Sequence, residues 1–155
     1  MNEQRLNEIL RSAQNRCAHS GAKLTAKRRR ILEILLSKKT PQSAYEVAGL
    51  YNKNSDTRMP PMSVYRILEF LESEHLVHKL SSTNKYIACS HITCDHKHEV
   101  PQFLICESCN SVKEVLISRS TLEDIGQQVL ASGYKLVNDH LELRCLCASC
   151  VQKND

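Results

Sequence analysis

The chain has 155 residues, with 21 Lys and Arg against 17 Asp and Glu, which is enough for one ordinary domain or two small ones and too few for a large enzyme barrel. A hydrophobic share of 41% and a charged share of 25% are ordinary for a globular protein and far from the composition of disordered chains. No apolar run approaches the roughly 20 residues of a membrane-spanning helix, and the N-terminal segment lacks the apolar core of a secretory signal. We therefore expect a folded, cytoplasmic protein.

The two halves of the chain differ in charge and in cysteine content. Residues 1–80 carry 14 Lys and Arg against 8 Asp and Glu, whereas residues 81–155 carry 7 against 9. Seven of the eight cysteines, all but Cys17, lie in the second half. The basic half therefore favours a polyanionic partner, and the cysteine-rich half, in a reducing compartment, favours metal ligation over disulfides.

The first half begins with a succession of short predicted helices. Apolar residues recur at helical spacing from Leu6 to Cys17, which predicts a helix that ends near residues 19–21 and buries Cys17. Thr25 is a suitable N-cap for a second helix and Ser43 for a third.

A fourth helix is predicted to begin after the Pro-Pro pair at 60–61, with Tyr65 and Arg66 on its outer face. Two β-prone stretches, 75–80 and 85–89, are separated by a turn-rich connection and predict a hairpin. Three or four short helices closed by a small hairpin are typical of the winged helix-turn-helix fold, whose last helix lies in the DNA major groove.

The outer face of the fourth helix is a candidate surface for reading DNA. Arg66 offers a pair of N–H donors for guanine, which is worth roughly 1 to 3 kcal/mol of discrimination against the wrong base. Tyr65 lies beside it on the same face, and Ser63 suits a phosphate. Helix periodicity alone fits a solvated face equally well. The basic residues between Lys23 and Arg30 favour DNA because they provide a phosphate-contacting surface.

The second half predicts a small α/β unit. We expect a strand around 112–117, then a helix with Leu122, Ile125 and Val129 on one face, and a strand over 134–146. Because a unit with so few strands leaves strand edges and apolar faces uncovered, we expect it to pair with a second copy of the chain.

The strongest motif is a pair of CxxC turns. Cys106 and Cys109 form the first, Cys147 and Cys150 form the second, and 37 residues separate the two turns. Two such turns complete a tetrahedral shell of four thiolates around zinc, with Zn–S distances near ~2.3 Å, and leave no open position for catalysis. The alternative is a pair of redox motifs or unrelated cysteines. Cys145 is not assigned as a ligand because strand alternation puts it on the apolar face of its strand.

A looser cluster of possible metal ligands surrounds the junction of the two halves. It consists of imidazoles, thiols and one carboxylate: His78, Cys89, His91, Cys94, His96, His98 and Glu114. Mixed N, S and O ligands suit a borderline ion that would join the two halves. Each residue taken singly is as well explained as a surface imidazole, a small buried thiol or a solvated carboxylate.

Several short segments together resemble the ferric uptake regulator family and, within it, the zinc-sensing branch. The matching segments are Lys23-Leu24-Thr25-Ala26-Lys27-Arg28, Ser43-Ala44-Tyr45-Glu46, Ser63-Val64-Tyr65-Arg66, His78-Lys79, Tyr86-Ile87-Ala88-Cys89 and the two CxxC turns. They span about residues 6–151. The chain departs from the family pattern at Ala26, where relatives often have Pro, and at Ser63, where Thr is usual.

The resemblance implies an α+β protein in three parts: a winged-helix DNA-binding domain at 1–84, a hinge at 85–92, and an α/β dimerisation and metal-binding domain at 93–155. It implies that the four CxxC cysteines hold a structural zinc ion. It also implies a regulatory zinc ion whose ligands are His78, Cys89, His98 and Glu114.

Two points of this ligand set rest on choices among neighbouring histidines. His98 is chosen over His96 because the spacing to Cys106 differs among relatives. His140 resembles a ligand of an additional site in some members and is not assigned one here. The thiolate at Cys89 favours zinc over ferrous iron because thiolates are soft ligands.

The expected DNA contacts come from the helix starts and the fourth helix. They are Lys23, Thr25, Arg28, Arg29, Tyr45, Ser63, Tyr65 and Arg66. The function expected is that of a zinc-responsive repressor that binds palindromic operator DNA as a zinc-loaded homodimer and controls zinc uptake genes, without a membrane or small-molecule substrate.

Three other functions compete with this hypothesis. Within the family, an iron- or peroxide-sensing regulator is the nearest one. A zinc-ribbon interaction protein without DNA binding would explain the CxxC turns but not the clustered arginines. An enzyme is disfavoured because the sequence has no HExxH motif and no phosphate-binding Gly-rich loop, with four glycines in all.

Overall fold

The computed structural model describes residues 3–94, 99–137 and 140–152. The chain divides into two compact units, Met1–Asp95 and His96–Asp155. Among the described residues, no helix is long and apolar enough to cross a lipid bilayer.

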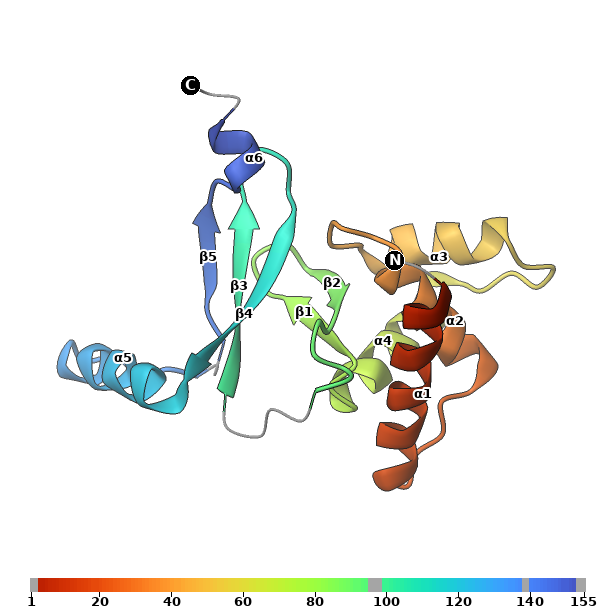
Figure 1. The fold of residues 1–155 in the computed structure, drawn as a ribbon, viewed down its shortest axis with the longest axis horizontal. Coiled ribbons are helices and arrows are strands. Elements are labelled where there is room, and N and C mark those ends of the chain that lie inside the picture. The colour runs from red at the N-terminus through yellow and green to blue at the C-terminus, as the bar shows by residue number, and fades with distance from the viewer. Residues whose placement is uncertain (1–2, 95–98, 138–139, 153–155) are drawn as a thin grey trace. The chain divides into compact units, whose positions relative to one another are not determined.

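The first unit opens with two helices that follow the predicted apolar spacing (Figure 1). Helix α1 spans Glu3–His19 and buries Cys17, as predicted. Helix α2 spans Ala26–Leu36, and Thr25 precedes it with the extended backbone of an N-cap residue. The buried face of α2 is aliphatic, and its basic residues lie on the exposed side.

Helices α3 and α4 begin at the two strongest start signals in the sequence. Helix α3 (Ala44–Lys53) carries a capping box, in which the Glu46 N–H donates to Ser43 Oγ at 3.1 Å and the Ser43 N–H donates to the Glu46 carboxylate at 2.6 Å. This backbone hydrogen bond lowers the pKa of Glu46. Helix α4 (Pro61–Ser73) has proline at its first position, where no N–H is needed.

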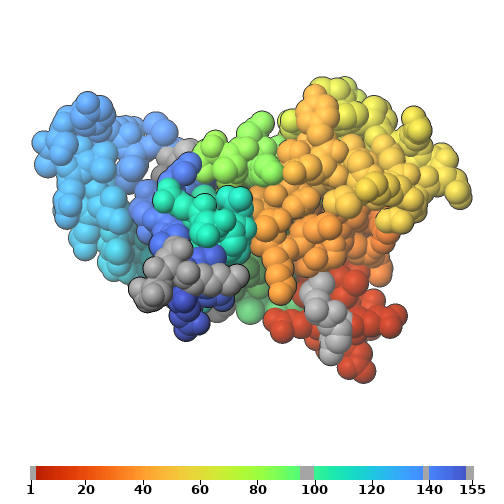
Figure 2. Space-filling model, turned by 90° about the horizontal axis from the view of Figure 1, so that it is seen from above, coloured from red at the N-terminus to blue at the C-terminus, as the bar shows by residue number. Residues whose placement is uncertain are grey.

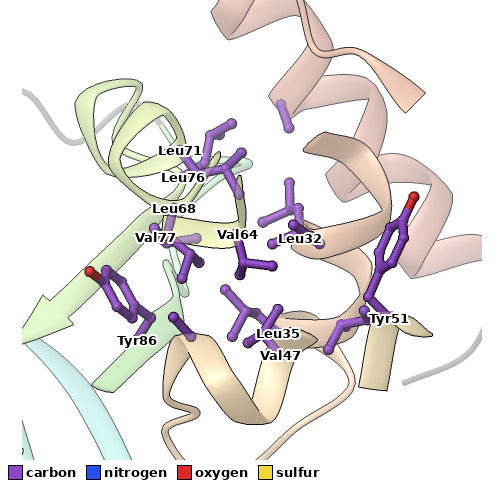
Figure 3. Close-up of a cluster of buried hydrophobic side chains, with 14 of the residues drawn as sticks. Leu32, Leu35, Val47, Tyr51, Val64, Leu68, Leu71, Leu76, Val77 and Tyr86 are labelled. Carbon is purple, nitrogen blue, oxygen red and sulfur yellow. The ribbon is translucent and has the colours of Figure 1, made fainter. Parts of the chain in front are cut away.

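The helices of the first unit and its hairpin enclose one hydrophobic core (Figure 3). Helix α4 contributes Val64, Leu68 and Leu71, each fully buried. Figure 3 shows Val64 beside Leu32 of α2, and Leu71 beside Leu76. The i, i+4, i+7 spacing on α4 therefore fixes which face turns inward and leaves Arg66 on the outside.

The hairpin consists of β1 (Val77–Leu80) and β2 (Lys85–Ala88), paired antiparallel. It is attached to the α2–α3 connection, because Gln42 and Tyr86 exchange both backbone hydrogen bonds at 2.8 and 2.9 Å. Four helices closed by this hairpin form the predicted winged helix-turn-helix arrangement. The hinge predicted at 85–92 stays a prediction, and its first four residues form β2.

Arg16, near the end of α1, holds the segment that follows the hairpin. Its guanidinium donates to the carbonyl groups of His75 and Ile92, each at 3.0 Å, and to those of His91 and Cys94 at 3.4 Å. Hydrogen bonds from a charged donor are worth about 1.5–3 kcal/mol each. One side chain therefore ties this segment to α1 and to the turn between α4 and β1.

The second unit is built on a three-stranded sheet in the order β4-β3-β5 (Figure 1). Its central strand is β3 (Glu99–Cys106), which pairs antiparallel with β4 (Val112–Ser118) and parallel with β5 (Glu142–Cys145). Helix α5 (Arg119–Ala131) follows β4, and helix α6 (Ala148–Val151) ends the described chain.

The sequence did not predict β3 or α6, and it predicted too long a final strand. Strand β3 combines Pro101 and Gln102 with a continuous apolar run, so it lacks the polar–apolar alternation that identifies a half-buried strand in a sequence. The strand predicted over 134–146 is only four residues long, since residues 134–137 adopt no regular structure.

Few apolar side chains of the second unit are buried. Phe103 and Ile105 of β3 are buried, but α5 has no buried residue. The large apolar side chains that this unit exposes are Leu130, Tyr134, Val137, Leu143, Leu146 and Val151. A unit of this size needs more stabilisation than so small a core provides, which a metal centre and a second copy can supply.

The contacts of Arg16 predict a local effect on stability. Arg16→Gln should speed amide hydrogen exchange at Cys89 and Cys94 about tenfold, because a loss of about 1.4 kcal/mol opens the segment that much more often. Mass spectrometry of exchanged peptides measures this. Arg11→Gln, an exposed position on the same helix, is the matched control, and equal exchange in both variants would contradict the assignment.

Candidate metal centres and DNA-binding surface

The two CxxC turns meet in the second unit. The sulfur atoms of Cys106, Cys109, Cys147 and Cys150 all lie within 4.8 Å of one another. Cys109 Sγ and Cys147 Sγ are 3.7 Å apart, close to the roughly 3.8 Å between ligands of a tetrahedral ion with Zn–S bonds near 2.3 Å. Four thiols at this spacing fit a zinc ion and leave no position for a substrate.

Strand pairing and one tight turn produce this convergence. The parallel pairing of β3 and β5 sets Cys106 opposite Cys145, which brings the start of the second CxxC turn next to the first. The first turn closes with the Cys106 N–H donating to the Ser111 carbonyl at 2.9 Å and with Asn110 in the left-handed region at φ 57°. The turn thereby aims Cys109 toward the second pair.

Backbone donors favour the ionised form of the first two thiols. The Cys147 N–H donates to Cys106 Sγ at 3.3 Å and, together with the Cys109 N–H, lowers the pKa of Cys106 to about 6. The Ser111 hydroxyl, 3.0 Å from Cys109 Sγ, lowers the pKa of Cys109. Both thiols are therefore prepared for metal binding, which requires thiolates.

Cys150 shows the opposite tendency. The Ser108 side chain lowers its pKa, but the thiol of Cys147, burial and the other two thiols together raise it to about 11. Four adjacent thiols resist full ionisation because each thiolate repels the next. A divalent cation removes this repulsion, and this supports metal binding as the purpose of the cluster.

Two further cysteines lie outside this cluster. The Cys145 thiol donates to the Ile105 carbonyl at 3.6 Å, in the strand pairing next to the four ligands. Cys17 lies in the core of the first unit, and burial raises the pKa of its thiol. A buried thiol with a raised pKa is unreactive and serves packing.

Two residues of the second predicted ligand set come together within the first unit. His78 lies on β1 opposite Ile87, and Cys89 follows β2, with its N–H donating to the Leu76 carbonyl at 3.0 Å. A ring nitrogen of His78 and Cys89 Sγ lie within 4.8 Å of each other. One imidazole and one thiol at this separation suit two positions of a tetrahedral zinc ion.

The other two predicted ligands belong to the second unit. Glu114 lies on β4 opposite Phe103 and is buried. His98 and the alternative His96 lie outside the described residues. His140, which the sequence leaves unassigned, lies 3.7 Å from the Glu142 carboxylate and packs edge-on against Phe103.

The outer faces of α3 and α4 present the residues predicted to read bases. Arg66 is exposed, and the Tyr45 side chain is 67% exposed. Tyr45 and Tyr65 stack edge to face with ring centroids 6.3 Å apart. Tyr65 is half-buried against the core, so this contact holds the exposed Tyr45 ring beside the predicted recognition helix.

Two of the predicted phosphate contacts already have partners inside the first unit. Arg28 donates to the Lys23 carbonyl at 2.6 Å and stacks on Phe70, with Cζ 3.4 Å from the ring centroid. Arg29 forms an ion pair with Glu33 at 3.0 Å. The i,i+4 spacing of Arg29 and Glu33 is visible in the sequence, whereas the contact of Arg28 with Phe70 is not. Lys27, part of the same predicted basic surface, lines one pocket together with Arg66.

The four-thiol cluster predicts that removal of one ligand unfolds the second unit. Cys106→Ser should lower zinc content and lose the unit's cooperative thermal transition, because the small apolar core cannot replace the metal. Zinc analysis and circular dichroism measure the two effects. Cys145→Ser, one strand away, is the control and should retain both. A folded, zinc-replete Cys106→Ser dimer would contradict the assignment.

The chain is similar to known regulatory proteins over most of its length. A profile of the ferric uptake regulator family matches residues 19–144. The chain is 34% identical to the zinc uptake regulation protein of Escherichia coli (strain K12) over 146 residues, which cover 94% of this chain and 82% of that protein. It is 25% identical to the peroxide operon regulator of Bacillus subtilis (strain 168) over 150 residues, 94% of this chain and 96% of that protein.

Solved structures are also similar to this chain over nearly its whole length. A zinc uptake regulator complexed with zinc and DNA matches with a TM-score of 0.80 and 32% identity, over 96% of this chain and 97% of that one. The holo form of XcZur matches with a TM-score of 0.75 and 31% identity, over 94% of this chain and 99% of that one. The chain belongs to the ferric uptake regulator family.

Proposed function

We propose that the chain is a zinc-responsive transcriptional repressor that binds palindromic operator DNA as a zinc-loaded homodimer and controls zinc uptake genes. The observation that carries the proposal is the similarity, over 96% of the chain, to a zinc uptake regulator complexed with zinc and DNA. The exposed outer faces of α3 and α4 and the four-thiol cluster support it from the chain itself.

The structural ion is zinc, held by Cys106, Cys109, Cys147 and Cys150. Support comes from the donor set and spacing, since four converging thiols bind zinc far better than magnesium or calcium. Bound there, zinc supplies a closed tetrahedral centre that joins the ends of β3 and β5. This role is separate from sensing, because the site stabilises the fold and so stays filled.

The regulatory site uses His78, Cys89, His98 and Glu114. The convergence of His78 and Cys89 within the first unit supports the first half of this set. A ligand set drawn from both units restricts their relative movement when the site is filled. It thereby favours the spacing of two recognition helices that matches two operator half-sites.

DNA is read from the first unit. Arg66 and Tyr65 of α4 and Tyr45 of α3 face the major groove, and Ser63, Lys23 and Thr25 face phosphates. The exposure of Tyr45 and Arg66 supports this assignment. Arg28 and Arg29 reach DNA only if they exchange their internal partners for phosphate.

The homodimer forms through the second unit, which we assign to residues 93–155 after a DNA-binding domain at 1–84 and a hinge at 85–92. The short edge strand β5 and the exposed apolar side chains of this unit support pairing with a second copy. The chain acts in the cytoplasm and is not an enzyme, since a regulator with a closed four-thiol centre needs no catalytic group.

Zinc is favoured over iron or peroxide as the signal. The relative named for zinc uptake is 34% identical and the one named for a peroxide operon is 25% identical. The thiolate of Cys89 agrees with this difference because it favours zinc over ferrous iron. Metal analysis of the purified dimer, with iron and manganese tested in parallel, separates the three regulators.

The proposal predicts reciprocal coupling between zinc and DNA. If zinc raises DNA affinity by a given factor, operator DNA must raise zinc affinity at the regulatory site by the same factor, typically 5- to 150-fold. Cys89→Ser should abolish this factor and leave a folded dimer, because Cys89 is not one of the four clustered thiols. Fluorescence anisotropy against buffered free zinc measures it.

Cys94→Ser is the matched control because Cys94 is an exposed thiol of the same segment and is not in the proposed ligand set. It should respond to zinc as the unchanged protein does. Identical zinc affinity with and without operator in the unchanged protein would overturn the proposed function, and a normal response of Cys89→Ser would overturn the ligand assignment alone.

A further inference from the structure

A pocket of about 220 Å³ opens beside the first turns of α4 in the first unit. Three cationic side chains from three elements line it: Lys27 of α2, Arg58 of the α3–α4 connection, and Arg66 of α4. The hydroxyl-bearing residues Tyr51, Thr57 and Ser63 also line it. Figure 2 shows the α3–α4 connection, in yellow, on the surface of the first unit.

None of these three cations is paired within the described part of the chain. Over residues 3–94, 99–137 and 140–152, no ion pair or side-chain hydrogen bond involves Lys27, Arg58 or Arg66. The cations next to Lys27 differ in this respect. Arg28 stacks on Phe70 and donates to a carbonyl, and Arg29 and Arg30 both pair with Glu33.

Three cations around one small pocket repel one another, and an anion in the pocket relieves that repulsion. The lining suits a phosphate group in particular. Arginine matches phosphate oxygens with two parallel N–H donors, lysine adds a point charge, and the hydroxyl groups of Thr57 and Ser63 add neutral donors.

We propose that Lys27 and Arg58 bind one phosphate of the DNA backbone in this pocket, next to the base that Arg66 reads. The inference rests on the proposed function and extends it, because the sequence places Lys27 only in a general phosphate-contacting surface and does not predict Arg58 as a DNA contact. The phosphate is held between α2 and the α3–α4 connection, at the start of α4. It therefore fixes how far the recognition helix enters the groove, while Arg66 remains directed to a base edge.

This assignment predicts a loss of affinity that does not depend on sequence. Lys27→Gln and Arg58→Gln together should weaken operator and unrelated duplex alike, by about tenfold at moderate salt. The slope of log affinity against log salt should fall by about 0.9 per subunit, because one phosphate contact per subunit is lost. Arg66→Ala should instead reduce discrimination at one base pair and weaken operator binding selectively.

The experiment uses the full-length, zinc-loaded dimer and measures binding to both duplexes over a series of salt concentrations. Lys113→Gln and Lys135→Gln together, two exposed lysines of the second unit, remove the same two charges outside the pocket and are the control for net charge. Arg58→Lys in place of Arg58→Gln keeps a cation in the pocket and should recover most of the affinity that the glutamine variant loses. Circular dichroism confirms that each variant is folded.

The outcomes separate the pocket from the proposed function. If the unchanged dimer binds operator with zinc and the pocket variant matches the control that carries Lys113→Gln and Lys135→Gln, the pocket assignment is overturned and the function stands. If the unchanged dimer ignores DNA, both are overturned. Inorganic phosphate, followed by phosphorus NMR, tests a free anion as the other source. Binding of free phosphate with unchanged DNA affinity in the pocket variant also overturns the assignment.

Discussion

The stability of the second unit depends on four thiols held within 4.8 Å of one another. The unit is a three-stranded sheet with one unburied helix beside it, and Phe103 and Ile105 are among its few buried apolar side chains. Hydrophobic burial of this size does not balance the conformational entropy of about sixty residues. The coordination of one ion, with an apparent free energy of about 10–16 kcal/mol in zinc-finger peptides, supplies the missing stabilisation. The same argument explains why the cluster is closed to substrate, since each ligand position is needed for the fold.

The first unit is stabilised in a different way, and this difference suits it to a separate task. Its core follows the apolar spacing of four helices and requires no ion, so the DNA-reading face persists whether or not a regulatory site is filled. The proposed ligand Cys89 lies in the segment after β2. Arg16 binds three carbonyl groups of this segment, and Cys89 and Ile92 pack in the core of the first unit. The ligand is therefore held to the DNA-binding unit both by hydrogen bonds from one charged side chain and by core packing.

Local chemistry made most of the first unit predictable, and long-range pairing made much of the second unit unpredictable. The helix starts at Ser43 and Pro61 rest on side-chain and ring chemistry that a sequence displays directly. Strand β3 has no such signature, because its apolar residues follow one another without alternating with polar ones. The same distinction holds in the site. The spacing of the two CxxC turns predicted a convergence of four sulfurs, which the structure has. The i,i+4 pair of Arg29 with Glu33 is visible in the sequence, but the stacking of Arg28 was not predictable, because Arg28 meets Phe70 only through the packing of α2 on α4.

The pairing of charges divides the basic residues of the first unit into two groups with different roles. Arg28, Arg29 and Arg30 have contacts that stabilise α2, so moving any of them to DNA breaks an existing interaction and reduces the net gain. Lys27, Arg58 and Arg66 face one another across a pocket without a compensating charge among the described residues, so an anion there removes a repulsion as well as forming new contacts. A phosphate therefore binds more favourably in the pocket than along the exposed face of α2. Because the pocket adjoins the start of α4, this gain is obtained only when the recognition helix lies at one depth and register in the groove, and backbone affinity then contributes to the accuracy of base reading.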